Sequence, residues 1–309
     1  MEKGVSARRF PIHIAVFLAP AVLIYSLFMI YPLIDTFRFS LFSPNEAGNL
    51  NFVAFDNYVK LLTDPDWSSS FWNALYNNFI LFLVHMLVQN PIGLLLAALL
   101  SLPVLKGRQI YRTAIFMPTM MSVVIIGFIW QLILNPLWGV AETLMWHVGL
   151  DAFFYPWLGD EATALITLSL ISVWQWVGIP MMLIYAALLG IPEDLTEAAE
   201  IDGASHMQIF WKIKLPLILP TLGVVSVLTF VANFNAFDLI YAVKGALAGP
   251  NFSTDIMGTL FYRVFFGFQL QIGDASMGAT VATTMFLIIL VGILFYLFVI
   301  QRRMQRYTF

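Results

Sequence analysis

Six stretches of the sequence are long and apolar enough to cross a membrane, and no other feature limits the fold so strongly. A transmembrane helix needs about 20 consecutive, mostly apolar residues. Hydrophobic residues make up 60% of the chain and charged residues 11%, which is typical of polytopic membrane proteins. We therefore predict an all-α membrane protein with one domain, residues 1–309, and six transmembrane helices. The predicted spans are residues 11–35, 79–103, 112–135, 162–189, 215–238 and 276–300.

The distribution of Lys and Arg predicts how the chain is oriented, because loops on the cytoplasmic side of a membrane carry the excess of these residues. With six spans, 11 of the 15 Lys and Arg residues fall on one side of the membrane. That side contains both termini and the loop 191–216, so we predict that all three are cytoplasmic. The eleven residues are Lys3, Arg8, Arg9, Lys106, Arg108, Arg112, Lys212, Lys214, Arg302, Arg303 and Arg306.

The loop 191–216 combines a cluster of acids with the signals for two short helices. Gly203 can supply the left-handed residue that ends the first helix. Ser205 and Gln208 have the spacing of a capping box that begins the second helix, and Pro216 is expected to end it. We therefore predict an elbow of two short helices. The acids are Glu193, Asp194, Glu197, Glu200 and Asp202.

The charge of this loop distinguishes two interpretations. One is an amphipathic segment lying at the membrane surface. Anionic lipid attracts Lys and Arg, whereas this loop sets five acids against Lys212 and Lys214, a net charge of −3. A basic protein partner fits that charge better.

The residues of the loop resemble a known motif, the EAA loop in permease subunits of bacterial ABC importers. The resemblance is closest to the carbohydrate-uptake group, which includes the maltose and glycerol-phosphate systems, and it extends from about residue 12 to the end of the chain. It implies that the loop is a coupling helix that docks on a separate ATPase. The matching residues are Glu197, Ala198, Ala199, Ile201, Asp202, Gly203, Ala204, Phe210 and Pro216.

The same resemblance implies a fold, a location and a set of partners. The fold is that of a type I ABC importer permease, in the bacterial inner (cytoplasmic) membrane. The expected partners are a second homologous permease subunit, two ATPase subunits, an extracellular or periplasmic solute-binding protein, a sugar-like substrate and membrane lipid. ATP and Mg²⁺ are expected to bind to the ATPase. The importer is expected to work by alternating access.

Polar residues at the outer end of the fifth span are the best candidates for a substrate path. Polar groups are costly in hydrocarbon, so these should face the bundle interior or a water-filled cavity. Hydrogen bonds between helices by Asn233 or Asn235 are the structural alternative, and recognition of sugar hydroxyls with aromatic stacking is the functional one. Residues 234–241 also resemble the helix that lines the path in carbohydrate importers. The candidates are Thr229, Asn233, Phe234, Asn235, Phe237 and Asp238, with Trp174, Gln175 and Trp176 of the fourth span as weaker ones.

Two features of the outer loops bear on the substrate and its delivery. Residues 55–62 are expected to form a short surface helix. Residues 244–250 keep the Gly-Pro of the Thr-x-Gly-Gly-Pro turn usual in the family but lack its Thr and doubled Gly. Arg263 or Lys244 is a candidate partner for an anionic group on the substrate.

Several functions find no support in the sequence. There is no G-x-x-x-x-G-K-[ST] phosphate loop, no cysteine, no metal-ligand spacing among the four histidines and no basic aromatic patch for nucleic acid. We therefore predict a transport subunit without catalytic residues, metal or cofactor of its own. Two alternatives remain: an ABC permease for amino acids or peptides, and an ion-coupled secondary transporter. The second would need acids near the membrane midplane, whereas Asp35, Asp238 and Asp274 lie at helix ends.

Overall fold

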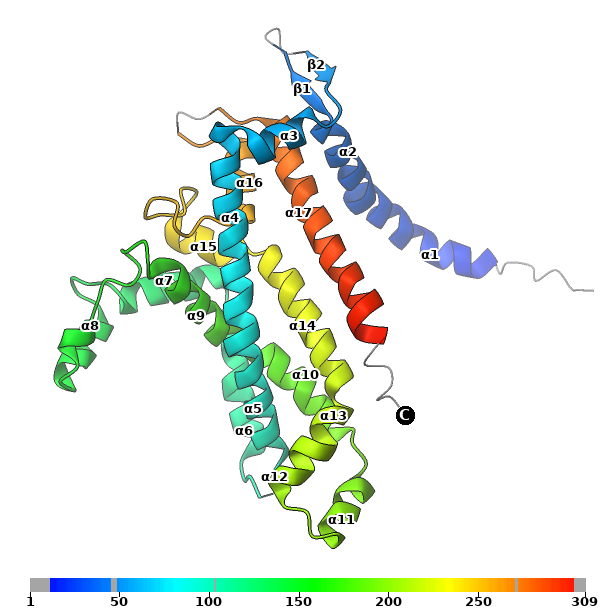
Figure 1. Ribbon diagram of the computed structural model, residues 1–309, viewed down its shortest axis with the longest axis vertical. Coiled ribbons are helices and arrows are strands. Elements are labelled where there is room, and N and C mark those ends of the chain that lie inside the picture. Colours follow the sequence, from blue (N-terminus) through cyan, green and yellow to red (C-terminus); the bar gives the residue numbers. More distant parts are fainter. Residues whose placement is uncertain (1–11, 46–48, 103, 270–271, 303–309) are drawn as a thin grey trace, which may run out of the picture.

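The computed structural model describes residues 12–45, 49–102, 104–269 and 272–302, and in this part of the chain the helices account for six candidate spans (Figure 1). Four are helices long and apolar enough to cross a membrane, and two are bent helix pairs. The predicted number of spans is therefore confirmed. In chain order the spans comprise α1 (Ile12–Tyr25), η1 (Ser26–Ile30) and α2 (Tyr31–Ser40); α4 (Pro65–Val84), η2 (His85–Gln89) and α5 (Asn90–Ser101); α6 (Arg108–Phe116), η3 (Met117–Met120) and α7 (Val123–Ile133); α9 (Ala164–Trp176) and α10 (Gly178–Leu189); α14 (Leu219–Phe234) and α15 (Asp238–Lys244); and α17 (Ala275–Phe295) and η6 (Tyr296–Gln301).

Shorter elements lie in the connections between these spans. The outer connections contain a hairpin of β1 (Phe42–Pro44) and β2 (Leu50–Phe52), followed by α3 (Asp56–Thr63), α8 (Val140–His147), η4 (Asp151–Phe153) and α16 (Met257–Phe266). The acidic loop contains α11 (Glu193–Ile201), α12 (His206–Ile209), η5 (Phe210–Lys214) and α13 (Leu215–Leu217). Helix α3 confirms the predicted short helix at 55–62.

Three spans are bent or broken. The third bends by 97° between η3 and α7, where Met121 and Ser122 are extended just after Pro118. The fourth bends by 42° between α9 and α10. The fifth leaves the helical conformation at Asn235, so α14 ends before the predicted boundary at residue 238. Proline and glycine are tolerated in membrane helices whether or not they bend them, so the sequence does not reveal the angles.

The helix that contains the second span extends beyond the predicted membrane part, residues 79–103. It runs without interruption from Pro65 to Ser101, 37 residues. At 1.5 Å per residue it measures about 55 Å, well above the roughly 30 Å of a hydrocarbon core. Its first half therefore continues outside the membrane and supports α3 and α16 at that end (Figure 1).

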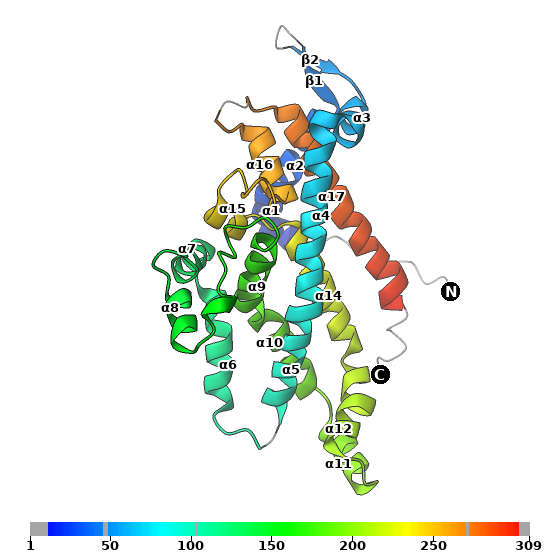
Figure 2. The ribbon, with the colours of Figure 1, turned by 60° about the vertical axis from the view of Figure 1, so that its left-hand side comes forward.

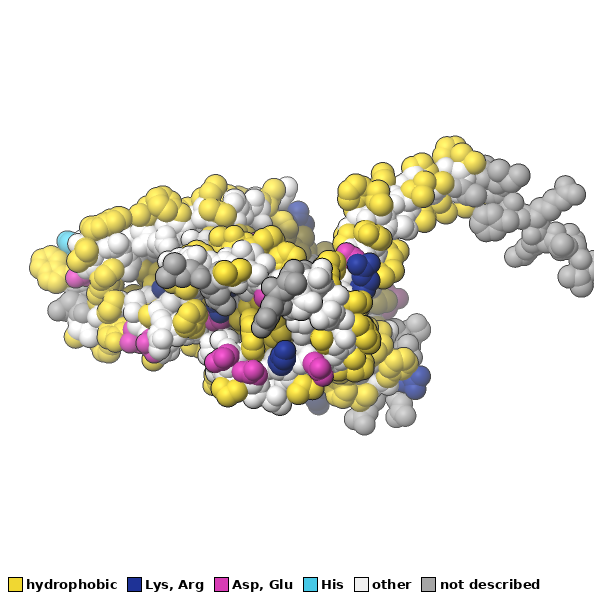
Figure 3. Space-filling model, turned by 90° about the horizontal axis from the view of Figure 1, so that it is seen from above, with side chains coloured by type: hydrophobic (Ala, Val, Ile, Leu, Met, Phe, Trp, Pro, Cys, Tyr) yellow, Lys and Arg dark blue, Asp and Glu magenta, His cyan; other side chains and the backbone are white. Residues whose placement is uncertain are grey.

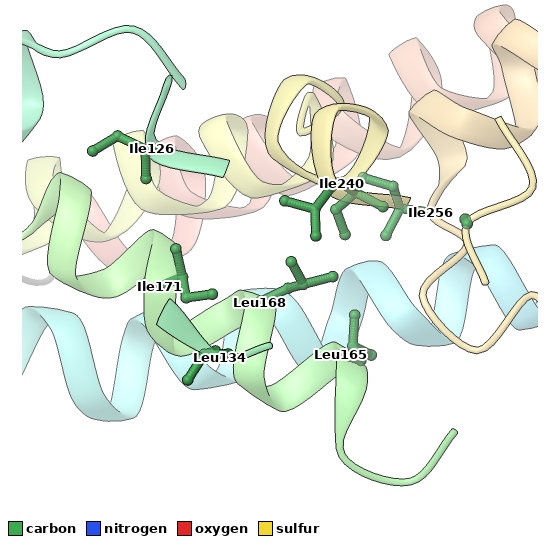
Figure 4. Close-up of a cluster of buried hydrophobic side chains, with 9 residues drawn as sticks. Ile126, Leu134, Leu165, Leu168, Ile171, Ile240 and Ile256 are labelled. Atoms are coloured by element: carbon green, nitrogen blue, oxygen red, sulfur yellow. The ribbon is translucent and has the colours of Figure 1, made fainter. Parts of the chain in front are cut away.

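Three clusters of buried apolar side chains follow one another along the molecule. At the outer end, α3, α4, α16 and α17 enclose a cluster that includes Phe71 and Met257. The middle cluster joins α7, α9 and α15 and includes Ile126, Leu168 and Ile240 (Figure 4). Around the ends nearest the acidic loop, α5, α10 and α14 form the third, whose members are Ala97, Leu100, Met181, Ile184, Tyr185, Leu188, Ile218 and Val225.

A hydrogen-bonded network fixes the outer loop to the bundle. The Arg263 guanidinium donates to both carboxylate oxygens of Asp255, at 2.6 and 3.2 Å, and to the carbonyl of Ala246 at 2.9 Å. From α4, Asn77 donates to the carbonyl of Asp255 at 2.7 Å. Arg263 is 5% exposed, and Lys244 donates to the carbonyl of Leu158. The proposed use of Arg263 or Lys244 to bind an anionic substrate therefore does not match their positions, because both are engaged in structural contacts.

The first helix stands apart from the rest of the molecule. Figure 3 shows α1 extending away from the body, and α2 contacts α17. The side chains of Phe17 and Leu23 are 82% and 68% exposed. An apolar surface of this kind is compatible with lipid or with another subunit, as the prediction of a transmembrane span requires.

Candidate functional site

The acidic loop folds into the predicted elbow, which we define as residues 193–212. Helix α11 ends in a Schellman motif, in which the N–H of Ala204 donates to the carbonyl of Ala199 at 2.9 Å and the N–H of Gly203 donates to the carbonyl of Glu200 at 3.0 Å. Gly203 has φ +79°, a value that costs a residue with a side chain. Its surroundings are open, since an added Cβ would meet no atom within 4 Å.

The second half of the elbow begins as predicted and ends later. The N–H of Gln208 donates to Ser205 Oγ at 3.4 Å, and the N–H of Ser205 donates to Gln208 Oε1 at 2.8 Å, which forms the capping box. Pro216 lies in the last turn of the helical run 206–217, which comprises α12, η5 and α13. The break comes at Ile218, two residues after the predicted end.

The elbow protrudes from one end of the molecule with its acids exposed (Figures 1 and 2). The turn between α5 and α6, which carries Lys106 and Arg108, lies at the same end, as the orientation argument requires. Of the predicted coupling residues, Glu197, Ala198, Ile201, Asp202 and Gly203 are exposed, Ala204, Phe210 and Pro216 are half-buried, and Ala199 is buried.

Apolar side chains are exposed beside these acids. Ile201 is 86% exposed, Met207 66% and Trp211 57%. Ile209, which the sequence analysis did not single out, is buried at 2% exposure and anchors α12. A surface that combines exposed carboxylates with large apolar side chains is suited to a protein partner with basic and apolar groups.

A cavity of about 490 Å³ lies where the broken spans meet. Its walls come from α4 and η2, from the beginning of α7, from α9 and α10, and from α14 with the segment that leads to α15. The bend between α9 and α10 and the end of α14 at Phe234 keep these helices from closing over the space. Cavities of this size accommodate small ligands.

Most of the predicted path residues line this cavity. They are Thr229, Asn233, Asn235, Phe237, Asp238 and Trp176. Phe234, Trp174 and Gln175 lie outside it. Phe234 packs against the Phe82 and Phe230 rings, with centroids 6.4 and 4.6 Å away, and Trp174 packs against Trp130 at 5.6 Å.

Gln175 is fully buried in the wall behind the cavity. Its backbone carbonyl accepts from Thr119 Oγ1 at 2.8 Å, and its side chain donates to the carbonyl of Met121 at 3.4 Å. These contacts hold α9 against the bend of the third span. Residues 174 and 176 are about 200° apart around a helix, so the two tryptophans face opposite ways.

The polar side chains of α14 are partly used within the protein. Asn233 Nδ2 donates to the carbonyl of Thr229 at 2.8 Å. Thr229 Oγ1 lies 2.9 Å from the carbonyl of Val225 and 3.2 Å from Asn90 Oδ1. Asn78 of α4 donates to the carbonyl of Asn233 at 2.7 Å. Hydrogen bonds between helices therefore do occur here, but Asn78 and Thr229 supply the donors that cross. The side chains of Asn233 and Asn235 donate to carbonyls one turn earlier in α14.

The sequence analysis missed three polar residues of the cavity wall. His85 Nδ1 lies 2.8 Å from the carbonyl of Leu81, and His85 Nε2 lies 3.0 Å from Ser172 Oγ. The carboxamide oxygen of Gln89, a residue only 5% exposed, has no hydrogen-bond partner among the described residues. The signal that could have found two of them is that His85 and Gln89 are the polar residues in the otherwise apolar stretch 79–89.

Comparison with known proteins assigns the family. Residues 89–306 match the family described as the binding-protein-dependent transport system inner membrane component. The chain belongs to this family. Among its relatives, the probable ABC transporter permease YurN of Bacillus subtilis is 34% identical over 271 residues, which cover 86% of this chain and 89% of YurN.

Two further relatives extend the comparison. The arabinooligosaccharide transport system permease AraP of Bacillus subtilis is 30% identical, with 89% of this chain and 84% of AraP covered. A chain in the crystal structure of a bacterial ABC transporter that imports the acidic polysaccharide alginate superposes with a TM-score of 0.78 at 23% identity, and the match covers 94% of this chain and 95% of that chain. The fold of an ABC importer permease is therefore confirmed, and the chain is a multi-pass inner-membrane transport component.

Proposed function

We propose that this chain is one of two homologous permease subunits in an ATP-driven importer of sugars or sugar-like solutes. Two ATPase subunits, which bind ATP and Mg²⁺, complete the machine on the cytoplasmic side of the bacterial inner membrane. A solute-binding protein delivers the substrate from outside. The family assignment supports the binding-protein dependence, and the name of the relative AraP supports an oligosaccharide substrate.

One observation carries the mechanism: the elbow lies between two helices that both line the cavity. Helix α10 ends at Leu189, just before the elbow, and α14 begins at Leu219, just after it. Ile179, Pro180 and Leu183 of α10 face the same space as Thr229 and Asn233 of α14. A force on the elbow therefore reaches both walls through short connections: residues 190–192 lead back to α10, and one turn at Ile218 precedes α14.

The elbow is suited to receive such a force from the ATPase. Glu197 meets a basic group of the ATPase, and the small side chains of Ala198 and Ala199 allow the two surfaces to approach. Gly203 sets the angle between α11 and α12. When ATP binding closes the ATPase pair, the elbow moves, and the cavity changes the side of the membrane to which it opens. This is alternating access with ATP as the energy source.

The alternatives differ from this proposal in energy source or substrate. A secondary transporter would depend on an ion gradient, and an amino-acid permease would take up zwitterions. The family assignment weighs against the secondary transporter, and the names of the sugar-transport relatives weigh against the amino-acid permease.

The test is uptake by the intact complex reconstituted in vesicles with its binding protein. We expect uptake of a radiolabelled oligosaccharide that requires ATP and survives an ionophore that collapses the proton gradient. Uptake that follows the proton gradient at constant ATP would refute the ATP-driven mechanism. Uptake of amino acids but of no oligosaccharide would refute the substrate class.

A further inference from the structure

The cavity walls are mostly apolar, and a small set of polar groups with one carboxylate interrupts them. Among the described residues that line the cavity, Asp238 is the only acidic one, and none is Lys or Arg. The remaining polar groups are the hydroxyls of Ser172 and Thr229 and the amides of Gln89, Asn233 and Asn235, with one imidazole, His85.

The imidazole fits its partners as a neutral ring. The carbonyl of Leu81 can only accept, so His85 Nδ1 donates to it at 2.8 Å. His85 Nε2 is then free to accept from Ser172 Oγ at 3.0 Å. Both nitrogens are thereby satisfied without a positive charge.

The two nearest basic residues in the sequence after α14 are held by other partners. Lys244 donates to the carbonyl of Leu158, and Arg263 is paired with Asp255 in the outer network. Neither lines the cavity. An anionic solute would therefore lose its hydration shell, gain no cationic partner from this wall, and face Asp238.

An uncharged polyhydroxylated solute meets the opposite situation. The unpartnered oxygen of Gln89 can accept from a hydroxyl once the side chain turns, and buried groups of this kind gain most from a partner. Asp238 and Asn235, both exposed to the cavity, accept or donate to further hydroxyls. Trp176 also lines the cavity, and its indole can pack against the C–H side of a sugar ring.

We propose that this cavity passes uncharged polyhydroxylated solutes and that Asp238 excludes solutes that carry a carboxylate, sulfate or phosphate. The proposal rests on the proposed function and narrows its substrate class. It also separates this chain from the alginate importer, whose substrate is an acidic polysaccharide although the fold is shared.

The absence of cysteine from the chain allows a direct test that needs no knowledge of the sugar. Ala232 lines the cavity and is exposed to it. In the full complex, Ala232→Cys would be treated with two methanethiosulfonates of similar size, one trimethylammonium and one sulfonate. The modification rate of this chain is measured by mass spectrometry. Each rate is divided by the rate of the same reagent with free cysteine.

The proposal predicts that the cationic reagent reacts at least about tenfold faster than the anionic one after this correction, because a unit charge acts strongly in a partly dehydrated site. Adding Asp238→Asn should bring the two rates toward equality. Equal corrected rates with Asp238 present, a faster sulfonate, or a thiol that neither reagent reaches would overturn the proposal.

Uptake by the same complex separates this proposal from the proposed function. Galactotriose and trigalacturonate differ only in carrying CH₂OH or a carboxylate at the same position of each ring. Uptake of trigalacturonate as fast as that of neutral trisaccharides would overturn the exclusion of anions. ATP-dependent uptake of no sugar at all would refute the proposed function, while the thiol rates would still decide the charge of the cavity.

Discussion

Replacing Gly203 tests whether the shape of the elbow controls its contact with the ATPase. Gly203 has φ +79°, and a residue with a side chain pays about 1–2 kcal/mol for that conformation. Gly203→Ala should therefore disfavour the native elbow by roughly 5- to 30-fold. Gly203→Pro should cost about 3 kcal/mol or more, because proline requires φ near −65° and cannot make the 3.0 Å hydrogen bond to Glu200.

These costs convert directly into affinity if the ATPase binds the folded elbow. The apparent dissociation constant rises as the fraction of competent elbow falls. The upper limits, reached when the native elbow is only marginally stable, are about 30-fold for Gly203→Ala and 100-fold or more for Gly203→Pro. The assay is titration of the purified permease pair in detergent with fluorescently labelled ATPase.

Gly149 provides a matched control at the end of α8. It has φ +72°, its surroundings are equally open, and the N–H of Leu150 closes the same Schellman motif by donating to the carbonyl of Met145 at 2.8 Å. Gly149→Pro damages a helix end in the same way in an outer connection. We expect it to leave ATPase affinity unchanged. Wild-type affinity in Gly203→Pro, or equal losses in both variants, would refute the role of the elbow.

Two other substitutions test the outer network and the cavity wall. Arg263→Met leaves the Asp255 carboxylate buried without its partner and should cost about 3–5 kcal/mol of stability, measured as a lower melting temperature of the complex. Burial already raises the pKa of Asp255 and Arg263 opposes that rise, so the pKa of Asp255 should climb further in the variant. The variant's loss of stability should therefore be largest at pH 8, where the buried carboxylate is charged, and smallest at pH 5. An unchanged melting temperature at both pH values would contradict the structural role. Trp176→Ala should slow sugar uptake roughly three- to tenfold by removing an aromatic wall, whereas Trp174→Ala, which faces away from the cavity, should not; equal effects would contradict the assignment.

The local features of the elbow were predictable because their causes are local. Gly203 and the pair Ser205 and Gln208 specify a helix end and a helix start within a few residues, and the structure has both. The predicted end of the second helix at Pro216 came two residues too early, because the helical run continues to Leu217 and breaks at Ile218. The exact last residue of a helix is its least predictable feature.

The cavity was predictable only in part, because its shape depends on angles between helices. The 97° bend of the third span arises at extended residues that the sequence does not mark. The directions in which Trp174 and Trp176 point depend on how α9 is rotated about its axis, and contacts with the third span fix that rotation. Polar residues in an apolar helix located the cavity where they were followed, as at Asn233, and the same guide applied to η2 would have identified His85 and Gln89.

The central claim is that the acidic elbow binds an ATPase, and co-purification tests it most directly. The chain would be expressed together with the genes that neighbour its own, purified in detergent, and the complex weighed by mass spectrometry. We predict a second permease subunit and two copies of an ATPase. We also predict that Glu197→Lys, which places a positive charge at an exposed site of the elbow, removes the ATPase and leaves the permease pair intact. Recovery of this chain alone, or a complex unchanged by Glu197→Lys, would contradict the account.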